Sequence, residues 1–293
     1  MIVHQGKVVF TYGDVKENSY IASCRKSVLA MLYGKHVLSG KIKLGQTLDS
    51  LNIDDIGGLL PNEKKATIKD VLSARSGVFH AASNPGDYLE FAPTRGSVKP
   101  GQYWLYSNWD FNLAGFILEK QTGKTIYEDL ERTLAIPLGM QDWDSSIQHK
   151  SGDTTRSIYP AYHMWFSTRD MARIGLLMLN NGRWNNRQII DSTWVQEMIR
   201  PRTDFSEVNK NTPAYRGSNF YFGYGYFWWL WQNLSDRRFQ GGYSALGALG
   251  QTISVFPAVQ TVIVYKTKDN YERETSFPAR FRLLKLAVES KTN

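Results

Sequence analysis

Strand-type patterns occupy both ends of this 293-residue chain, whereas helix-type patterns fill its middle. Short apolar segments interrupted by Gly cover residues 2–12, and similar segments separated by Gly and Pro return between residues 221 and 266. In the middle, apolar residues recur every three or four positions, as they do on one face of a helix. Strands at both ends imply one sheet built from the two termini, with a helical lobe formed by the middle of the chain.

The apolar spacing and the Gly residues that end it predict the bounds of the elements. Helices are predicted at about residues 28–38 and at 68–75, 108–122, 125–134, 167–181, 192–199 and 277–290. Strands are predicted within residues 2–12 and at 221–232, 248–256 and 260–266. We therefore predict an α+β fold in one unit, residues 1–293, with no internal repeat. Its sheet lobe covers about residues 1–22 and 218–293, and its helical lobe about residues 23–217.

Composition excludes several classes of protein. The single cysteine, Cys24, excludes an internal disulfide and a cysteine-based zinc site. The five histidines lack ligand spacing, so we expect no bound metal. No apolar run approaches the roughly 18 residues of a membrane helix, so no transmembrane segment is expected. Residues 1–10 do not have the pattern of a signal peptide, and the compartment is not predicted.

The net charge of +8 favours anionic partners in general. The 35 Lys and Arg residues are nevertheless spread along the chain, without a basic arm or a recognised nucleic-acid motif. A solvated basic surface explains this distribution, and no nucleic-acid partner is expected. A basic, aromatic-rich nucleic-acid binder stays open as an alternative.

The tetrad Ser23-Cys24-Arg25-Lys26 is the only Ser-x-x-Lys of the chain, and it lies where a strand pattern turns into a helix pattern. A serine in the first helical turn places its hydroxyl near the positive end of the helix, and a lysine three residues later lies on the same face. Burial disfavours the ammonium form, so Lys26 can be the neutral base that accepts the proton of Ser23. The alternative is a helix-capping serine followed by a solvent-facing lysine. Cys24 points about 100° away around the helix and is not expected to be the nucleophile.

A second motif, Tyr106-Ser107-Asn108, is the only Tyr-x-Asn of the chain and precedes the predicted helix 108–122. A tyrosine beside a lysine can share a proton with it and deliver that proton to a leaving group. An amide two residues later can hold the lysine or a substrate carbonyl. A core tyrosine followed by an asparagine helix cap is the alternative.

Together these motifs resemble the penicillin-recognising serine hydrolases of the class C β-lactamase and DD-peptidase superfamily, the Ser-x-x-Lys group. Within it, the sequence is similar to the branch of 6-aminohexanoate-dimer hydrolase and related esterases and amidases. The further matching segments, in the same order, are residues 70–78 (DVLSARSGV), 100–101 (PG), 137–140 (PLGM), 166–175 (FSTRDMARIG), 224–226 (YGY) and 247–257 (GALGQTISVFP).

The resemblance implies a β-lactamase-like fold and a role for each motif residue. Ser23 is expected to be the acylated nucleophile, Lys26 its base, Tyr106 the general acid/base and Asn108 the supporting amide. The backbone N–H groups of Ser23 and of a residue near Ala248 would form the oxyanion hole. No cofactor is implied. Family members are often exported or periplasmic.

The sequence departs from the family at the third motif. Most of the superfamily carries Lys-Thr-Gly or His-Thr-Gly there, whereas this chain carries Ala245-Leu246-Gly247. Gly247 still leaves room for a substrate backbone, but the cationic side chain that would hold a substrate carboxylate is missing. We therefore expect poor β-lactamase activity. A second departure is that the family usually has additional residues before its first strand.

The aromatic residues around the motifs, Trp165 among them, favour an uncharged, partly apolar ester or amide as the small-molecule substrate. Core and sheet positions explain the same residues equally well. Two further readings stay open: a β-lactamase or DD-peptidase proper, and a penicillin-binding sensor protein with slow turnover. The oligomeric state is not predicted.

Overall fold

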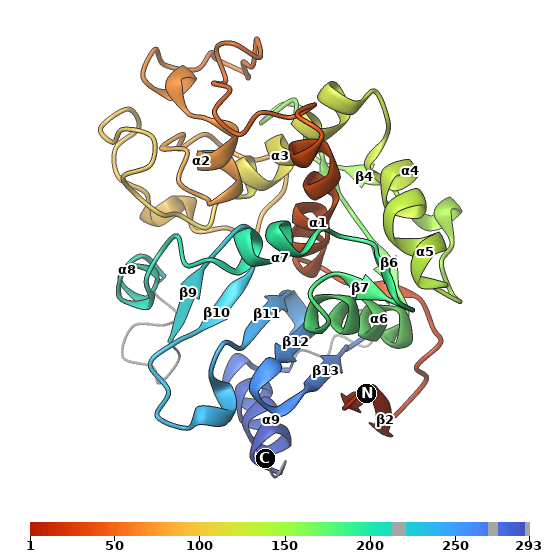
Figure 1. Cartoon of the computed structure of the whole chain (residues 1–293). Coiled ribbons are helices and arrows are strands. Elements are labelled where there is room, and N and C mark those ends of the chain that lie inside the picture. The colour runs from red at the N-terminus through yellow and green to blue at the C-terminus, as the bar shows by residue number, and fades with distance from the viewer. Residues whose placement is uncertain (213–220, 269–274, 291–293) are drawn as a thin grey trace.

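The computed structural model describes residues 1–212, 221–268 and 275–290 of the chain. In these ranges an antiparallel sheet of seven strands has the order β2-β1-β13-β12-β11-β10-β9 (Figure 1). Its strands are β1 (Ile2–His4), β2 (Lys7–Phe10), β9 (Phe222–Tyr224), β10 (Trp229–Trp231), β11 (Tyr243–Leu246), β12 (Thr252–Phe256) and β13 (Thr261–Tyr265). Short strands pair outside this sheet, namely β3 (Ser19–Tyr20) with β6 (Trp165–Phe166), β4 (Lys150–Ser151) with β5 (Ala161–Tyr162) and β7 (Arg183–Trp184) with β8 (Arg187–Gln188).

The two ends of the chain meet in this sheet. Strand β1 pairs antiparallel with β13, so that Ile2 lies opposite Ile263 and Val3 opposite Val262. Figure 1 shows the red N-terminal strands beside the blue C-terminal ones. The predicted α+β fold, with a sheet built from both termini and flanked by helices, is confirmed.

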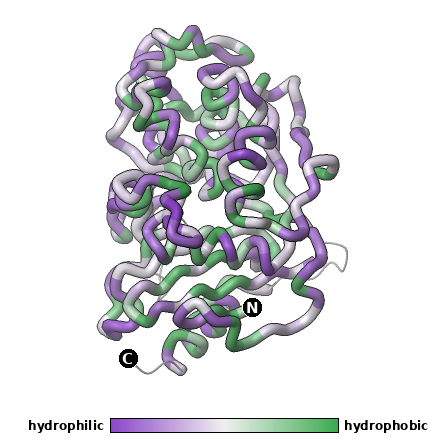
Figure 2. Tube along the Cα trace, turned by 45° about the vertical axis from the view of Figure 1, so that its right-hand side comes forward, coloured by the Kyte–Doolittle hydropathy of each residue, from purple (hydrophilic) through white to green (hydrophobic). Residues whose placement is uncertain are grey.

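Helices cover both faces of the sheet, which explains why its central strands are buried along nearly their whole length. On α6 (Thr168–Leu179), Gly175 lies so close to the sheet that an added Cβ would be 2.4 Å from Val262. On the opposite face, Trp231 stacks on Phe281 of α9 (Phe277–Glu289) with ring centroids 4.9 Å apart. In Figure 2 the apolar colour follows the strands of the sheet.

The helical lobe is built around α1 (Cys24–Leu38) and α3 (Asn108–Thr122), which contact each other. Nearly all of α1 is buried, and it also contacts β11, so it joins the helical lobe to the sheet. The other helices are α2 (Ile68–Leu72), α4 (Ile126–Leu130), α5 (Ile136–Leu138), α7 (Ser192–Ile199) and α8 (Phe205–Asn211). No helix among the described residues is both long enough and apolar enough to span a membrane.

Several sequence predictions needed correction. The single strand predicted at 221–232 was wrong, because the chain turns between β9 and β10, where Phe227 has a φ of +60°. The predicted strand 248–256 begins only at Thr252, after a 3-10 turn over Ala248–Gly250. Strand β11 was not predicted at all. The lobe boundary expected at residues 217–218 lies outside the described residues.

Candidate active site

Ser23 lies at the start of α1, where the chain leaves β3 through a tight turn. Strand β3 pairs with β6, and Ala22 in the turn has a left-handed φ of +48°. Ser23 occupies the N-cap position, yet its hydroxyl makes no capping hydrogen bond. The residues on either side of it are buried, whereas Ser23 itself is half-buried. Its hydroxyl is therefore free to contact Lys26 and lies at the edge of the protein interior.

Lys26 brings the two sequence motifs together. Its Nζ lies 3.0 Å from Oγ of Ser23, 2.7 Å from the hydroxyl oxygen of Tyr106 and 2.8 Å from Oδ1 of Asn108. The lysine is only 2% exposed, and the rings of Tyr106 and Phe111 both have their centroids 4.2 Å from Nζ. The four residues singled out in the Ser-x-x-Lys and Tyr-x-Asn motifs thus share one set of contacts.

Asn108, the first residue of α3, is held by the loop that precedes the Tyr-x-Asn motif. Its Nδ2 donates to the carbonyl of Pro85 at 2.8 Å, which turns Oδ1 toward Lys26. Its backbone N–H donates to Oδ2 of Asp87 at 3.0 Å. Sequence reasoning missed Asp87, although the turn-forming run Asn-Pro-Gly directly before it marks a loop at this place.

The surroundings shift the pKa values of the two titratable site residues in opposite directions. Burial lowers the pKa of Lys26 well below its ordinary value, and the charge of Arg25 lowers it further, whereas the Asp87 carboxylate raises it. Burial raises the pKa of Tyr106, and the nearby Ser23 hydroxyl opposes this only in part. Both shifts therefore favour the uncharged forms, a neutral amine and a protonated phenol.

The end of β11 presses against the turn that carries Ser23. A Cβ added to Gly247 would lie 2.8 Å from the carbonyl oxygen of Ile21 and 3.0 Å from the backbone nitrogen of Ser23. Behind it, Arg280 donates to the Gly247 carbonyl at 2.7 Å. In the described part of the chain, the backbone N–H groups of Ser23 and Ala248 donate no hydrogen bond. Two adjacent backbone donors are thus left for a ligand.

Ala245 and Cys24 lie behind the site rather than in it. Both are fully buried, and the Cys24 thiol donates to the Ala245 carbonyl at 3.5 Å. Burial raises the pKa of Cys24 to about 12, so this thiol is not activated. Within residues 1–212, 221–268 and 275–290, no group of three or more His, Cys, Asp or Glu side chains is arranged to hold a metal ion.

Trp165 belongs to a half-exposed aromatic group beside the nucleophile turn. It lies opposite Tyr20 in the β3–β6 pair, and Tyr20 precedes Ser23 by three residues. Its ring stacks on His149 with centroids 4.4 Å apart. Burial is the main reason that the pKa of the neighbouring His163 falls to about 4, so this ring is neutral at neutral pH. The group offers an apolar surface without a fixed charge.

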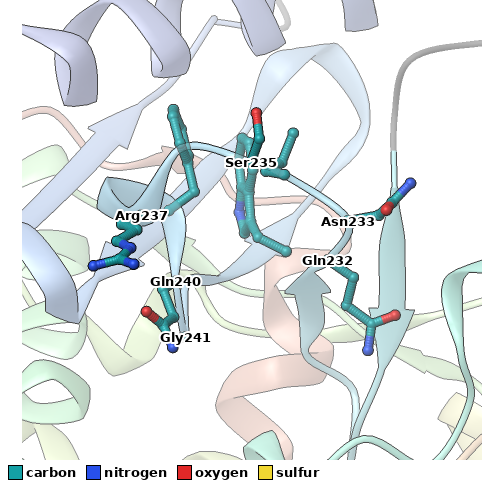
Figure 3. Close-up of a pocket in the computed structure, with 9 residues that line it drawn as sticks. Gln232, Asn233, Ser235, Arg237, Gln240 and Gly241 are labelled. Carbon is teal, nitrogen blue, oxygen red and sulfur yellow. The ribbon is translucent and has the colours of Figure 1, made fainter.

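Two of the hollows on the described part of the molecule lie away from this site. One, of about 300 Å³, is formed by the loop after β10 and is lined by Gln232, Ser235, Arg237 and their neighbours (Figure 3). The other, of about 660 Å³, lies between β1, the end of β13 and α9. None of the predicted site residues lines either hollow. The contacts around Lys26, and not these hollows, define the candidate active site.

Residues 1–287 match the family model described as Beta-lactamase. The chain belongs to the β-lactamase family. It is similar to 6-aminohexanoate-dimer hydrolase of Paenarthrobacter ureafaciens, with 26% identity over 184 residues. These residues make up 62% of this chain and 43% of that relative, so the match spans less than half of the relative's length.

Solved structures share the fold at lower identity. The octameric penicillin-binding protein homologue from Pyrococcus abyssi has a TM-score of 0.69 at 19% identity, covering 99% of this chain and 74% of that one. EstCE1, a hydrolase with promiscuous acyltransferase activity, has a TM-score of 0.62 at 14% identity, covering 90% and 86%. These likenesses show that the β-lactamase-family fold extends over nearly the whole chain.

Proposed function

We propose that this β-lactamase-family chain is a serine hydrolase that cleaves an ester or amide bond through an acyl-enzyme on Ser23. One observation carries the proposal: the buried amine of Lys26 contacts the hydroxyls of Ser23 and Tyr106 and the amide oxygen of Asn108. The chain acts as one catalytic unit, because α3 supplies Asn108 from the helical lobe and the end of β11 closes the site from the sheet lobe.

The hydrogen-bond count around Lys26 favours a neutral amine as the base. A neutral amine has two N–H donors and one lone pair, and Asn108 Oδ1 can only accept, so one N–H is used there. When the second N–H donates to the Tyr106 oxygen, the lone pair is left to accept the Ser23 proton. A charged ammonium has no lone pair and cannot be a base. The burial and the Arg25 charge that lower the pKa of Lys26 favour the active form.

The reaction then follows in two balanced steps. Ser23 Oγ attacks the substrate carbonyl carbon while Lys26 takes the serine proton, and the developing oxyanion accepts from the N–H groups of Ser23 and Ala248. Tyr106 protonates the leaving group as its bond to the carbonyl carbon breaks, and regains a proton from Lys26. In the second step a water molecule attacks the acyl carbon and gives its proton to the same pair. The bond between the acyl carbon and Ser23 Oγ then breaks, the pair returns that proton to Ser23 Oγ, and the acid leaves.

The substrate is an uncharged ester or amide. The third motif offers no cationic side chain, and the nearby Arg280 donates to the Gly247 carbonyl from behind the strand. A substrate carboxylate would thus lose a charge-assisted hydrogen bond of about 1.5–3 kcal/mol, which argues for weak or no β-lactamase activity. The half-exposed ring of Trp165 suits an apolar substrate group. Similarity to 6-aminohexanoate-dimer hydrolase and to the hydrolase EstCE1 supports ester or amide chemistry.

A fluorophosphonate probe tests the nucleophile, and a substrate panel tests the specificity. Wild type and the control Cys24→Ser should be labelled, whereas Ser23→Ala should not, and it should lose at least about 10⁴-fold in hydrolysis of p-nitrophenyl esters. Equal labelling of wild type and Ser23→Ala would overturn the proposal. A chromogenic cephalosporin hydrolysed as fast as the esters would favour a β-lactamase instead. A long-lived adduct on Ser23 without product would favour a sensor.

A further inference from the structure

Arg25, the second residue of α1, is a buried cation without a carboxylate beside it. It is 2% exposed, and its Nη2 donates to Oδ1 of Asn112 over 3.5 Å. The guanidinium carbon lies 4.4 Å from the centre of the Tyr162 ring. The remaining nitrogens, Nε and Nη1, have no hydrogen-bond partner. Among the described residues, no ion pair includes Arg25.

The groups around this guanidinium are neutral donors. The hydroxyls of Tyr127 on α4 and Tyr162 on β5 are near enough to feel the Arg25 charge, and the Tyr162 oxygen itself faces the Arg25 guanidinium as an acceptor. Among the described residues, neither phenol O–H has an acceptor of its own. Burial raises the pKa of both phenols, so both keep their protons. His163 is neutral near pH 7, as described above.

The carboxylate that acts on Tyr127 is already engaged elsewhere. Glu119 lies on α3, and its charge raises the pKa of Tyr127. One of its carboxylate oxygens accepts from the backbone N–H of Ile126 at 3.0 Å. Its other oxygen pairs with Lys150. The charge of Arg25 is therefore not balanced by this group.

An arginine side chain keeps its charge in proteins, and burying a charge without a partner is strongly unfavourable. Here two guanidinium nitrogens, which carry three N–H bonds, and two phenol O–H groups lie near the N-terminal end of a 15-residue helix, and together they have more buried donors than acceptors. We propose that Arg25, Tyr127 and Tyr162 bind a small monovalent anion of the halide type. A divalent anion is disfavoured because only one cation is there to balance it.

The anion would also act on the catalytic lysine, a consequence that rests on the proposed function, whereas binding itself does not. Arg25 lowers the pKa of Lys26, so an anion beside the guanidinium would cancel part of this effect. Halide binding would then leave less neutral Lys26 at a given pH and move the acid limb of the pH–activity profile to higher pH.

Bromide is the probe, because its anomalous scattering locates it in crystals. Wild-type crystals grown in sodium bromide should show an anomalous peak within hydrogen-bond distance of Nε or Nη1 of Arg25. Thermal unfolding in bromide and in gluconate at equal ionic strength gives a second readout. A bromide concentration ten times the Kd should raise the wild-type midpoint by about 2–4 °C.

Two variants complete the design. Arg25→Met keeps the length of the side chain without its charge and should lose both the peak and the midpoint shift. Arg187→Met removes an exposed arginine of β8 and should keep both. Wild type without a peak at Arg25 would overturn the proposal, because internal water then fills the region. If Arg25→Met does not fold, the peak in wild type decides. Neither readout depends on hydrolysis, so failure here is distinct from failure of the proposed function.

Discussion

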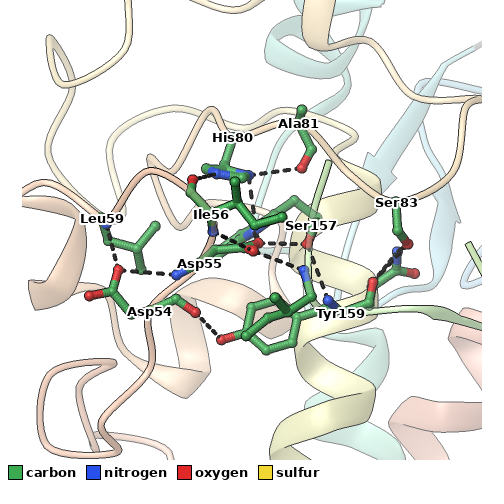
Figure 4. A network of polar contacts seen from close by, with 12 residues as sticks. Asp54, Asp55, Ile56, Leu59, His80, Ala81, Ser83, Ser157 and Tyr159 are labelled. Carbon is green, nitrogen blue, oxygen red and sulfur yellow. Dashed lines mark hydrogen bonds and ion pairs between the residues drawn. The ribbon is translucent and has the colours of Figure 1, made fainter. Parts of the chain in front are cut away.

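Lys26 and Asp55 are both buried in the helical lobe, yet their surroundings differ in kind. The Asp55 carboxylate accepts from Trp109 Nε1 at 2.7 Å, Ser157 Oγ at 2.5 Å and the backbone N–H of Ile158 at 2.9 Å. Figure 4 shows it enclosed by groups from several loops. Lys26 instead contacts neutral groups, two of them hydroxyls that can exchange protons with it, and one of these belongs to half-buried Ser23.

This difference separates a structural charge from a reactive one. Donors with fixed geometry around Asp55 join three distant parts of the chain, so its charge stabilises the fold. Among the described residues, the amine of Lys26 forms no ion pair with a carboxylate, and its pKa is lowered. Buried titratable groups with shifted pKa values beside an accessible nucleophile are typical of active sites. Removal of the Lys26 amine should therefore lower activity, whereas removal of the Asp55 carboxylate should lower stability.

The largest expected effect is on activity, from Lys26→Met. Without the amine, Ser23 has no base, so we expect kcat/KM for p-nitrophenyl esters to fall about 10⁴-fold. The free energy of unfolding should fall by no more than about 2 kcal/mol, because an apolar side chain of similar length replaces a buried polar one. Activity assays and urea unfolding check the two parts. Lys43→Met, at an exposed position, is the control; a folded Lys26→Met with normal activity would contradict the assignment.

Asp55→Ala should do the reverse. Its removal leaves the buried donors of Trp109 and Ser157 and the backbone N–H of Ile158 without an acceptor, so we expect the free energy of unfolding to fall by about 3–5 kcal/mol. Enzyme that remains folded should keep kcat within about tenfold, since no catalytic group is lost. Urea unfolding measures the first effect. Asp49→Ala, at an exposed position, should change stability by less than about 0.5 kcal/mol; an equally small effect of Asp55→Ala would remove the contrast.

The sequence predicts the fold best where the apolar period is clear. Helix α3 was predicted with its observed bounds, because its apolar residues repeat over four turns and Gly123 ends them. The β9–β10 hairpin was read as one strand, because aromatic residues run through its turn. Strand β11 has only four residues between glycines, too few to show a period. It is defined instead by its pairing with β10, which precedes it, and with β12, which follows it.

Within the site, too, contacts set by local spacing could be predicted, whereas contacts between distant segments could not. Spacing within one helical turn places Lys26 beside Ser23, and the Tyr-x-Asn motif could be found because it is short and precedes a clear helix. The contact between Asp87 and Asn108 joins a loop to a helix, and no periodic pattern predicts it. Arg25 lies inside the tetrad, but arginine is usually exposed, so its burial could not be predicted from its residue type.

Tyr106→Phe sharpens the assignment of the second proton carrier. The ring keeps its packing on Phe111, at 4.7 Å between centroids, while the phenol hydroxyl is lost. We expect kcat/KM to fall about 10²–10³-fold for alkyl esters and amides, whose leaving groups need a proton, and less for p-nitrophenyl esters. Rates over a series of leaving groups check this. Tyr88→Phe, whose ring lies 6.0 Å from that of Tyr106, is the control. An equal loss for every leaving group would contradict the acid role.

The smallest expected effect comes from Asp87→Asn. An asparagine at this position can still accept from the Asn108 backbone N–H, so only the negative charge is removed. That charge raises the pKa of Lys26, so its loss should lower this pKa and keep the amine neutral to lower pH. The acid limb of kcat/KM should move to lower pH by less than about one unit, because Asp87 is half-exposed and its field is screened.

Pre-steady-state and steady-state pH profiles of Asp87→Asn measure this shift, and Glu90→Gln provides a control at an exposed acidic residue of the same loop. Glu90→Gln should leave the acid limb in place. A limb that moves to higher pH in Asp87→Asn, or does not move at all, would mean that Lys26 does not set the acid limb. Lys26 would then be a structural group like Asp55, because a group whose protonation state does not control the rate is not the catalytic base.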